Sequence, residues 1–226
     1  MKDLSKFERI QLLRQFGMNT PVMCAFGTNA PTQVHDVLLE WPFEKVSIRT
    51  SIPVEKKRND VDIDWHAPFF HFLDPADAFK IYITERLNKY DVILTESIAR
   101  EEKIVGGNVI LFSERRDVWS VYHMIDQPIA IFEFFTGPGT IRDMADGKVE
   151  RHHLVAPLYG HLFTYNRHKK LSFSPYNKTG IFRLLQKVLR IVRRFPYAYG
   201  NHVEFSFEGM KHGWRNDHII FWEVRA

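Results

Sequence analysis

Two glutamates near the end of the chain lie inside runs of apolar and aromatic residues. Glu204 is in HVEFSF (202–207) and Glu223 is in HIIFWEVR (218–225), and both runs predict strands. If these strands pair, the two carboxylates can face each other, where they repel one another and each loses hydration. A divalent cation would relieve both costs, and Mg²⁺ favours one or two carboxylates with phosphates and water. The alternative is that both acids are solvated, or that one pairs with Arg225.

Strict alternation along the second run puts Glu223 and Arg225 on the same face as Ile219 and Phe221. Glu223 is therefore expected to lie inside an aromatic, largely buried strand. Burial disfavours the charged form of a carboxylate, which strengthens the expectation of a cation beside it.

Charged residues also interrupt three other apolar runs. Arg49 lies within VSIRTS, where its guanidinium must meet a polar cleft or a partner, and the guanidinium fork suits phosphate. Glu96 in VILTESI (92–98) and Glu133 in IAIFEFF (129–135) are acids that can contact a ribose hydroxyl. For all three residues the alternative is a structural ion pair, and for the two acids also a solvated position.

Other familiar sites are absent from the sequence or only weakly indicated. Gly106-Gly107 and Gly137-x-Gly139 can form backbone nests for phosphate, although hairpin turns explain them equally well. No G-x-x-x-x-G-K-[ST] or G-x-G-x-x-G is present, and no G-x-S-x-G marks a nucleophile. The 11 histidines include no zinc-binding spacing, and Cys24 is the only cysteine, so neither a disulfide nor a cysteine-based metal site is expected.

A basic amphipathic helix is expected at 179–195. Its apolar stripe consists of Ile181, Leu184, Leu185, Val188 and Val192, and its basic residues are Arg183, Lys187, Arg190 and Arg194. This pattern is typical of a core-facing helix with a solvated back face. The alternative is a basic strip that binds nucleic acid or an acidic protein.

The composition is that of a globular chain with a sizeable core. The 226 residues are 45% hydrophobic and 14% aromatic, with a net charge of +4. That mild excess suits nucleic acid, nucleotide phosphates or an acidic partner without choosing among them. The N-terminus lacks the apolar run of a signal peptide, and no run of about 18 apolar residues predicts a membrane span. We therefore expect a cytoplasmic protein with no membrane partner.

The elements that must position these side chains form an α+β pattern. Ser5-x-x-Glu8 predicts a capping box that opens a helix ending at Gly17. Strands are expected at 22–26, 45–50, 92–98, 108–112, 118–124, 129–135, 202–207 and 218–225, with further helices at 34–39 (or a turn), 74–90 and 179–195. The stretch EKKRNDVDID reads as an exposed loop, and 151–179 as irregular. The later strands are mostly antiparallel in this interpretation.

In this order the motifs resemble the ATP-grasp fold, most closely the nucleotide-binding domain of phosphoenolpyruvate synthase and pyruvate phosphate dikinase. The resemblance is diffuse and spans most of the chain, through GMNTP, VSIRTS, VILTESI, GGNVILF, IFEFFTGPG, VEFSF and IIFWEVR. It implies one ATP-grasp-like domain over 1–226. A small lobe at about 1–95 and a second at about 96–226 would hold a nucleotide in the cleft between them.

The resemblance also implies roles for individual residues. Glu204 and Glu223 would hold Mg²⁺, while Arg49 and Arg225 would contact the ATP phosphates. The adenosine side would be met by Glu96, Ser97, Ile98 and Glu133. Glycines are missing after Arg49, where the family has a phosphate-covering loop, and Lys56, Lys57 and Arg58 are expected to serve instead. The alternative is that this loop does not close over ATP. Glu223 stands where the close relatives usually carry glutamine.

These observations predict an ATP- and Mg²⁺-dependent ligase or phosphotransferase with a small-molecule or peptide acceptor. Catalysis would then consist mainly of positioning and charge neutralisation. The alternative is a non-catalytic module that binds nucleic acid or a protein through the basic helix segment 181–195. The phosphohistidine domain and the phosphoenolpyruvate barrel of the synthase are absent, so its full reaction is not implied.

Overall fold

The computed structural model describes residues 4–52, 67–97, 103–112, 128–158, 175–208 and 219–225. Several expectations lie outside these residues: the phosphate contacts of Lys56, Lys57 and Arg58, the adenine-side contact of Ile98, the loop EKKRNDVDID and the strand at 118–124. Among the described helices, none combines the length and the apolar character needed to cross a membrane.

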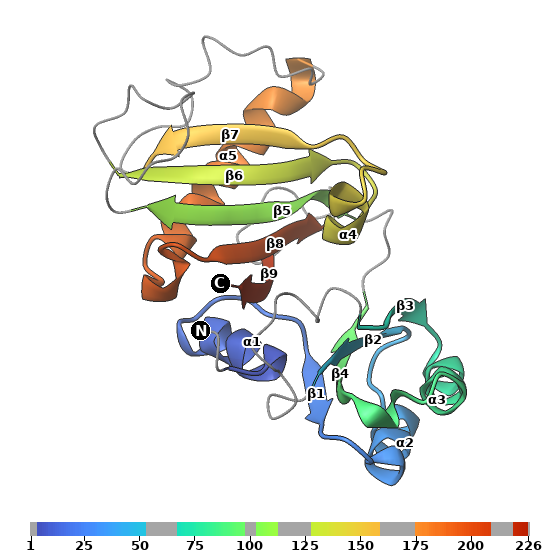
Figure 1. The fold of residues 1–226 in the computed structure, drawn as a ribbon. Helices are drawn as coiled ribbons and strands as arrows, with labels where there is room; N and C mark the ends of the chain where they lie inside the picture. The colour runs from blue at the N-terminus through green and yellow to red at the C-terminus, as the bar shows by residue number, and fades with distance from the viewer. Residues whose placement is uncertain are drawn as a thin grey trace. The chain divides into compact units, whose positions relative to one another are not determined.

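The chain forms two compact units, each with its own sheet (Figure 1). The four-stranded unit comprises Lys2–Gln11 and Pro21–Ala99, and the five-stranded unit comprises Leu12–Thr20 and Arg100–Ala226. Every strand pair in both sheets is antiparallel.

The four-stranded sheet has the order β1-β4-β2-β3, and two helices pack on one of its faces. Its elements are β1 (Met23–Phe26), α2 (Pro31–Leu39), β2 (Val46–Ser51), β3 (Phe69–Leu73), α3 (Pro75–Thr84), η3 (Leu87–Lys89) and β4 (Asp91–Glu96). Val46 and Ile48 of β2 join the core beneath the helices. By alternation, Ser47 and Arg49 lie on the opposite face.

Two differences from the sequence prediction occur in this unit. The expected helix at 74–90 is shorter, because α3 ends at Thr84 and Arg86 adopts a left-handed backbone with φ of 50°. The edge strand β3 was not predicted. It is bounded by Pro68 and Asp74, and its Phe69 and Phe72 stay exposed, so it lacks the buried alternation that marks a strand.

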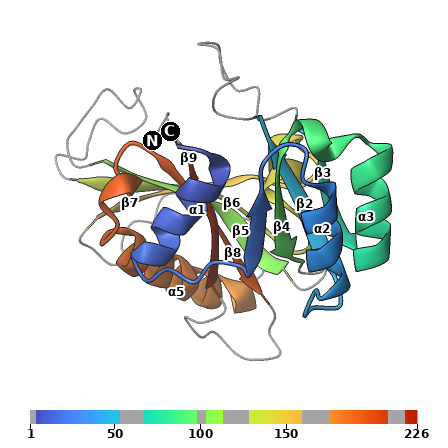
Figure 2. The same cartoon turned by 90° about the horizontal axis from the view of Figure 1, so that it is seen from below.

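The five-stranded sheet has the order β7-β6-β5-β8-β9. Its unit contains β5 (Lys103–Phe112), β6 (Ile129–Thr136), α4 (Ile141–Ala145), β7 (His152–Pro157), α5 (Pro175–Val192), η7 (Pro196–Ala198), β8 (His202–Glu208) and β9 (Ile219–Arg225). The helix α5 covers one face of this sheet (Figures 1 and 2). Its predicted apolar stripe is buried, and Arg183, Arg190 and Arg194 are exposed, as the amphipathic pattern predicts, whereas Lys187 is half-buried.

The stretch at 151–179 is more regular than the sequence suggested. It contains the strand β7, and α5 begins at Pro175 rather than at Thr179. Two adjacent histidines at the start of β7 hid its alternation, although Leu154 and Ala156 face the core. Proline is well suited to a first helical position, because its missing N–H is not needed there.

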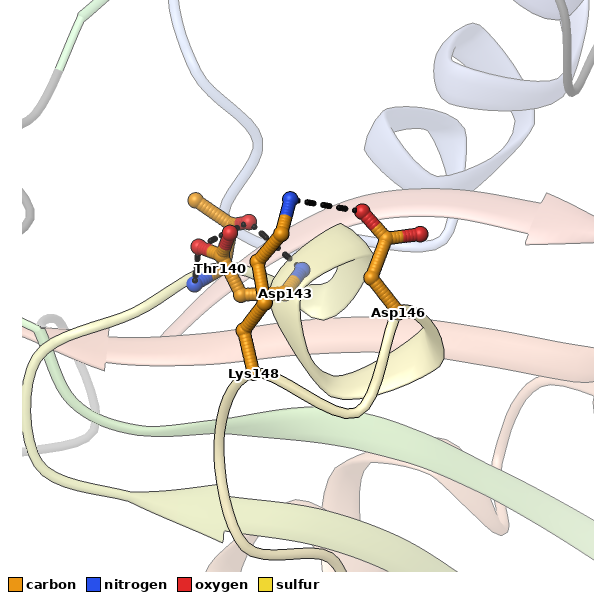
Figure 3. Close-up of polar contacts among 4 residues, drawn as sticks. All are labelled: Thr140, Asp143, Asp146 and Lys148. Atoms are coloured by element: carbon orange, nitrogen blue, oxygen red, sulfur yellow. Dashed lines mark hydrogen bonds and ion pairs between the residues drawn. The ribbon is translucent and has the colours of Figure 1, made fainter.

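Two capping boxes fix helix starts. At α1 (Lys6–Gln15) the Ser5 amide donates to Glu8 at 2.7 Å and the Glu8 amide donates to Ser5 Oγ at 3.2 Å, which confirms the prediction. A second box, which was not predicted, opens α4: Asp143 and Thr140 exchange the same pair of bonds (Figure 3). Gly17, with φ of 73°, ends the first helix region as expected.

The pair Gly106-Gly107 is neither a nest nor a turn, because both residues lie inside β5. A Cβ on Gly107 would overlap the carbonyl oxygen of Glu133 and the Cα of Phe134 on β6. A Cβ on Gly106 would lie 2.6 Å from the Phe135 ring. Glycine is therefore required here by the close approach of a neighbouring backbone and ring, rather than by a turn.

Candidate functional site

The hairpin of β8 and β9 places the two predicted acids opposite each other. Glu204 pairs with Glu223 in the antiparallel register, as the sequence predicts. Directly opposed residues share a face of the sheet, and their Cβ atoms are about 5 Å apart. Both acids are nearly inaccessible, with 6% of Glu204 and 2% of Glu223 exposed.

The predicted face of Glu223 is wrong, because a β-bulge interrupts β9. The register shifts between Glu204 and Phe205, so that Phe205 pairs with Phe221 and Trp222 is the additional residue. Ile219 and Phe221 consequently face the α5 side, while Glu223 faces the other way with Glu204.

Arg225 contacts the first of these acids. Its Nη2 forms an ion pair with Glu204 Oε1, which is the alternative that the sequence left open. In the register Arg225 pairs with His202, so the guanidinium reaches Glu204 from the neighbouring position. Burial and the nearby Arg225 charge lower the pKa of His202, so this imidazole is neutral at pH 7.

Asn108, which was not predicted as a site residue, extends the site to the central strand β5. It pairs with Glu204 on one side and with Glu133 on the other. Only 8% of Asn108 is exposed, and its Oδ1 has no hydrogen-bond partner among the described residues. A buried amide oxygen without a partner is costly, and such atoms commonly mark a place for an ion, water or ligand. In the sequence, the only hint of this role was that Asn108 is the polar residue inside the apolar run GGNVILF.

One residue from each strand completes a line across this face of the sheet. We call it the polar row: Glu223, Glu204, Asn108, Glu133 and His153. The strand neighbours of these residues, such as Val109, Phe132 and Phe205, belong to the core that α5 covers. The polar row therefore lies on the face opposite α5.

Glu133 lies in the polar row, with a guanidinium and an imidazole near its carboxylate. Its Oε1 is 3.5 Å from Arg151 Nη1 and 3.8 Å from His153 Nδ1. The ion-pair alternative for Glu133 is therefore present in the structure. Its predicted contact with the adenosine side stays a prediction.

The other predicted contacts lie in the four-stranded unit. Arg49 is half-buried on β2, between Phe69 of β3 and Ile93 of β4. Glu96 ends β4, and one of its carboxylate oxygens accepts a 3.5 Å hydrogen bond from the amide of Val22. The structure does not test the roles of these residues toward a nucleotide.

Ser97 belongs to a cluster of side chains that the sequence did not reveal. Its hydroxyl bonds Ser47 at 2.8 Å and lies 3.2 Å from His71 Nδ1, and it accepts from the Phe72 amide at 2.9 Å. Ser47 also contacts His71 Nδ1, at 2.8 Å. These bonds tie the ends of β2, β3 and β4 together. The predicted contact of Ser97 with the adenosine side stays a prediction.

Comparison with known sequences gives no match. No protein-family model and no curated protein matches the chain.

Solved structures do match in fold. N5-carboxyaminoimidazole synthase from Aspergillus clavatus, in complex with ADP and 5-aminoimidazole ribonucleotide, aligns with 97% of this chain at 14% identity and a TM-score of 0.51. Carboxyaminoimidazole ribonucleotide synthase from the same organism, complexed with ATP, aligns with 97% at 12% identity and a TM-score of 0.52. The chain covers 43% and 44% of these proteins, less than half of their length.

These likenesses show the fold: the chain has an α+β fold of the ATP-grasp type, as the sequence resemblance predicts. The closer resemblance to phosphoenolpyruvate synthase is not supported by them and stays a prediction.

Proposed function

We propose that this chain binds ATP with Mg²⁺ and is an ATP-dependent ligase or phosphotransferase of the ATP-grasp type. The observation that carries the proposal is the buried, directly opposed pair Glu204–Glu223 with Arg225 beside it. The two Aspergillus clavatus enzymes were solved with ADP and with ATP, and their common fold supports a nucleotide as the ligand here.

The chemistry of the polar row fits Mg²⁺. Glu204, Glu223 and the buried Oδ1 of Asn108 offer only oxygen, the donor that Mg²⁺ prefers. No three His, Cys, Asp or Glu side chains are grouped for a metal within the described ranges. A Mg²⁺ ion held by two carboxylates, with phosphates and water completing its shell, needs no such group. When bound, Mg²⁺ would neutralise charge on the transferred phosphate.

The chain's own cations would supply the remaining positive charge. We assign Arg225 and Arg49 to the ATP phosphates, because a guanidinium can bind phosphate oxygens through two parallel hydrogen bonds. Glu96, Ser97 and Glu133 are assigned to the adenosine side, as the resemblance implies. The acceptor is proposed to be a small molecule or a peptide, and the nucleotide cleft between the lobes stays a prediction.

A binding titration tests the nucleotide part of the proposal. ATP with Mg²⁺ should raise the melting temperature of the wild-type chain, since a ligand specific for the folded state stabilises by about 2.7 kcal/mol at 100 times Kd. Glu204→Gln and Glu223→Gln should each reduce the shift. Glu44→Gln is the matched control, because Glu44 is an exposed loop residue. An absent shift at millimolar ATP contradicts the proposal.

A trapping assay then separates the two reaction classes. A ligase that forms an acyl phosphate should yield a hydroxamate when carboxylic acids, ATP and hydroxylamine are supplied together. A phosphotransferase should instead place the labelled γ-phosphate on a stable acceptor. Release of phosphate without either product would indicate simple ATP hydrolysis and would count against both classes.

A further inference from the structure

Arg225 and a metal ion at the polar row would both bind the carboxylate of Glu204. Arg225 Nη2 contacts Glu204 Oε1, and Glu204 is one of the two proposed carboxylate ligands. Only 24% of the Arg225 side chain and 8% of the Glu204 side chain are exposed. Their attraction is therefore screened less than that of a surface pair, and the guanidinium is a substantial competitor for the carboxylate.

Asn108 of β5 lies on the side of Glu204 away from β9. Its side chain distinguishes Arg225 from a metal ion as the partner of Glu204. Arg225 carries only hydrogen-bond donors, yet the buried Asn108 Oδ1 accepts no hydrogen bond among the described residues. The guanidinium therefore leaves this oxygen unsatisfied. A metal ion next to Glu204 could be contacted by an oxygen from each of the two adjacent strands.

We infer that Arg225 is a built-in counter-ion that competes with a divalent cation for Glu204, and that Asn108 Oδ1 is a neutral oxygen ligand favouring the divalent cation. This inference rests on the proposed function for the identity of the metal. It requires that Arg225 leaves Glu204 when the divalent cation binds. The released guanidinium is then available to an anionic phosphate.

The competition couples metal binding to nucleotide binding. Mg²⁺ on the acids frees Arg225 for phosphate, and phosphate on Arg225 frees Glu204 for Mg²⁺. By linkage, each ligand must raise the affinity for the other by the same factor. Loss of the Arg225 guanidinium should therefore strengthen metal binding alone while weakening this cooperativity.

Mn²⁺ titration followed by electron paramagnetic resonance tests the inference without nucleotide or turnover. The full chain is used at pH 8. Arg225→Gln should bind Mn²⁺ about tenfold more tightly than wild type, because a charged hydrogen bond no longer competes. Arg225→Lys, which keeps the charge but loses the fork, should fall between them. Arg183→Gln, on the exposed face of α5, is the control and should match wild type.

The role of Asn108 is tested with Asn108→Leu, in which leucine has a similar volume and removes the unsatisfied oxygen. It should remain folded and should bind Mn²⁺ about tenfold more weakly, because one neutral ligand is lost. Equal Mn²⁺ affinity in Asn108→Leu and wild type overturns the role of Asn108. Unchanged or weaker Mn²⁺ binding in folded Arg225→Gln, including no binding at millimolar Mn²⁺, overturns the competition.

A parallel titration with ATP keeps this inference separate from the proposed function. If wild type shows no response to ATP with Mg²⁺ but the Mn²⁺ affinities follow the expected order, the proposed function fails and the competition stands. If wild type binds ATP with Mg²⁺ but the Mn²⁺ affinities do not change, the inference fails and the proposed function stands.

Discussion

Substitution of Gly107 by alanine should destabilise the five-stranded unit strongly. The added methyl would overlap the Glu133 carbonyl oxygen and Phe134 Cα, which are backbone atoms of the paired strand β6. Because neither atom can rotate away, β5 and β6 must separate locally. Overpacking of this kind costs about 1–3 kcal/mol, and the rigid neighbours put Gly107→Ala at the upper end, about 3 kcal/mol. Alanine also restricts the unfolded chain, which offsets about 0.4–1 kcal/mol.

Gly107→Ala should therefore lower the free energy of unfolding by about 2 kcal/mol net. For a chain of this size, the melting temperature should then fall by roughly 4–8 °C. Hydrogen exchange should locate the effect, with faster exchange of the β5 and β6 amides and unchanged exchange in β2 and β4. Gly27→Ala is the matched control, because a Cβ at Gly27 meets no atom within 4 Å. A Gly107→Ala chain as stable as wild type would refute the close approach of the two strands.

Three further predictions concern a cap, a pH dependence and a surface. Thr140→Ala removes the hydroxyl that caps α4 and should lower the free energy of unfolding by about 1 kcal/mol in urea denaturation. An unchanged urea midpoint would contradict the second capping box. Burial, and next the Arg225 charge, lower the pKa of His202 from 6.5, so the unfolded state binds more protons as the pH falls below about 6.5. The free energy of unfolding of wild type should therefore fall on acidification below that pH, and that of His202→Asn should fall less. Identical pH profiles of the free energy of unfolding in the two proteins would contradict this reasoning. Reversing Arg190 and Arg194 to glutamate should leave ATP binding nearly unchanged, because both side chains are exposed, Arg190 on α5 and Arg194 just after its end. Tight, salt-sensitive retention of DNA or RNA by wild type in filter binding would instead favour the nucleic-acid module. For duplex DNA, the logarithm of the binding constant should then fall with the logarithm of the salt concentration, with a slope of about −0.9 per phosphate contact.

Local sequence patterns predicted the features that depend on neighbouring residues. The Ser5–Glu8 capping box forms as expected, because its bonds join residues only three apart. The apolar stripe of α5 is buried for a similar reason, since a helical period of 3.6 places its members on one side. The antiparallel pairing of Glu204 with Glu223 also followed from two adjacent strand-like runs.

Features that depend on a second strand were less accessible. In the sequence, the glycines of β5 were compatible with a turn. Glycine is needed there because the backbone of β6, about 26 residues further along the chain, comes too close for a Cβ atom. The face of Glu223 was wrong for a related reason. A bulge is a mismatch between two strands, and the alternation of β9 by itself does not contain it.

The sequence by itself determined that acids and an arginine lie inside buried strands, because residue type and alternation are properties of one segment. Only the tertiary structure decided their partners. The order β9-β8-β5-β6-β7 brings Asn108 beside Glu204, and the bulge at Trp222 turns Glu223 to the same face. Arg225 reaches Glu204 across that hairpin. Strand order and register are set by the packing of the whole sheet against α5, and no single strand specifies them.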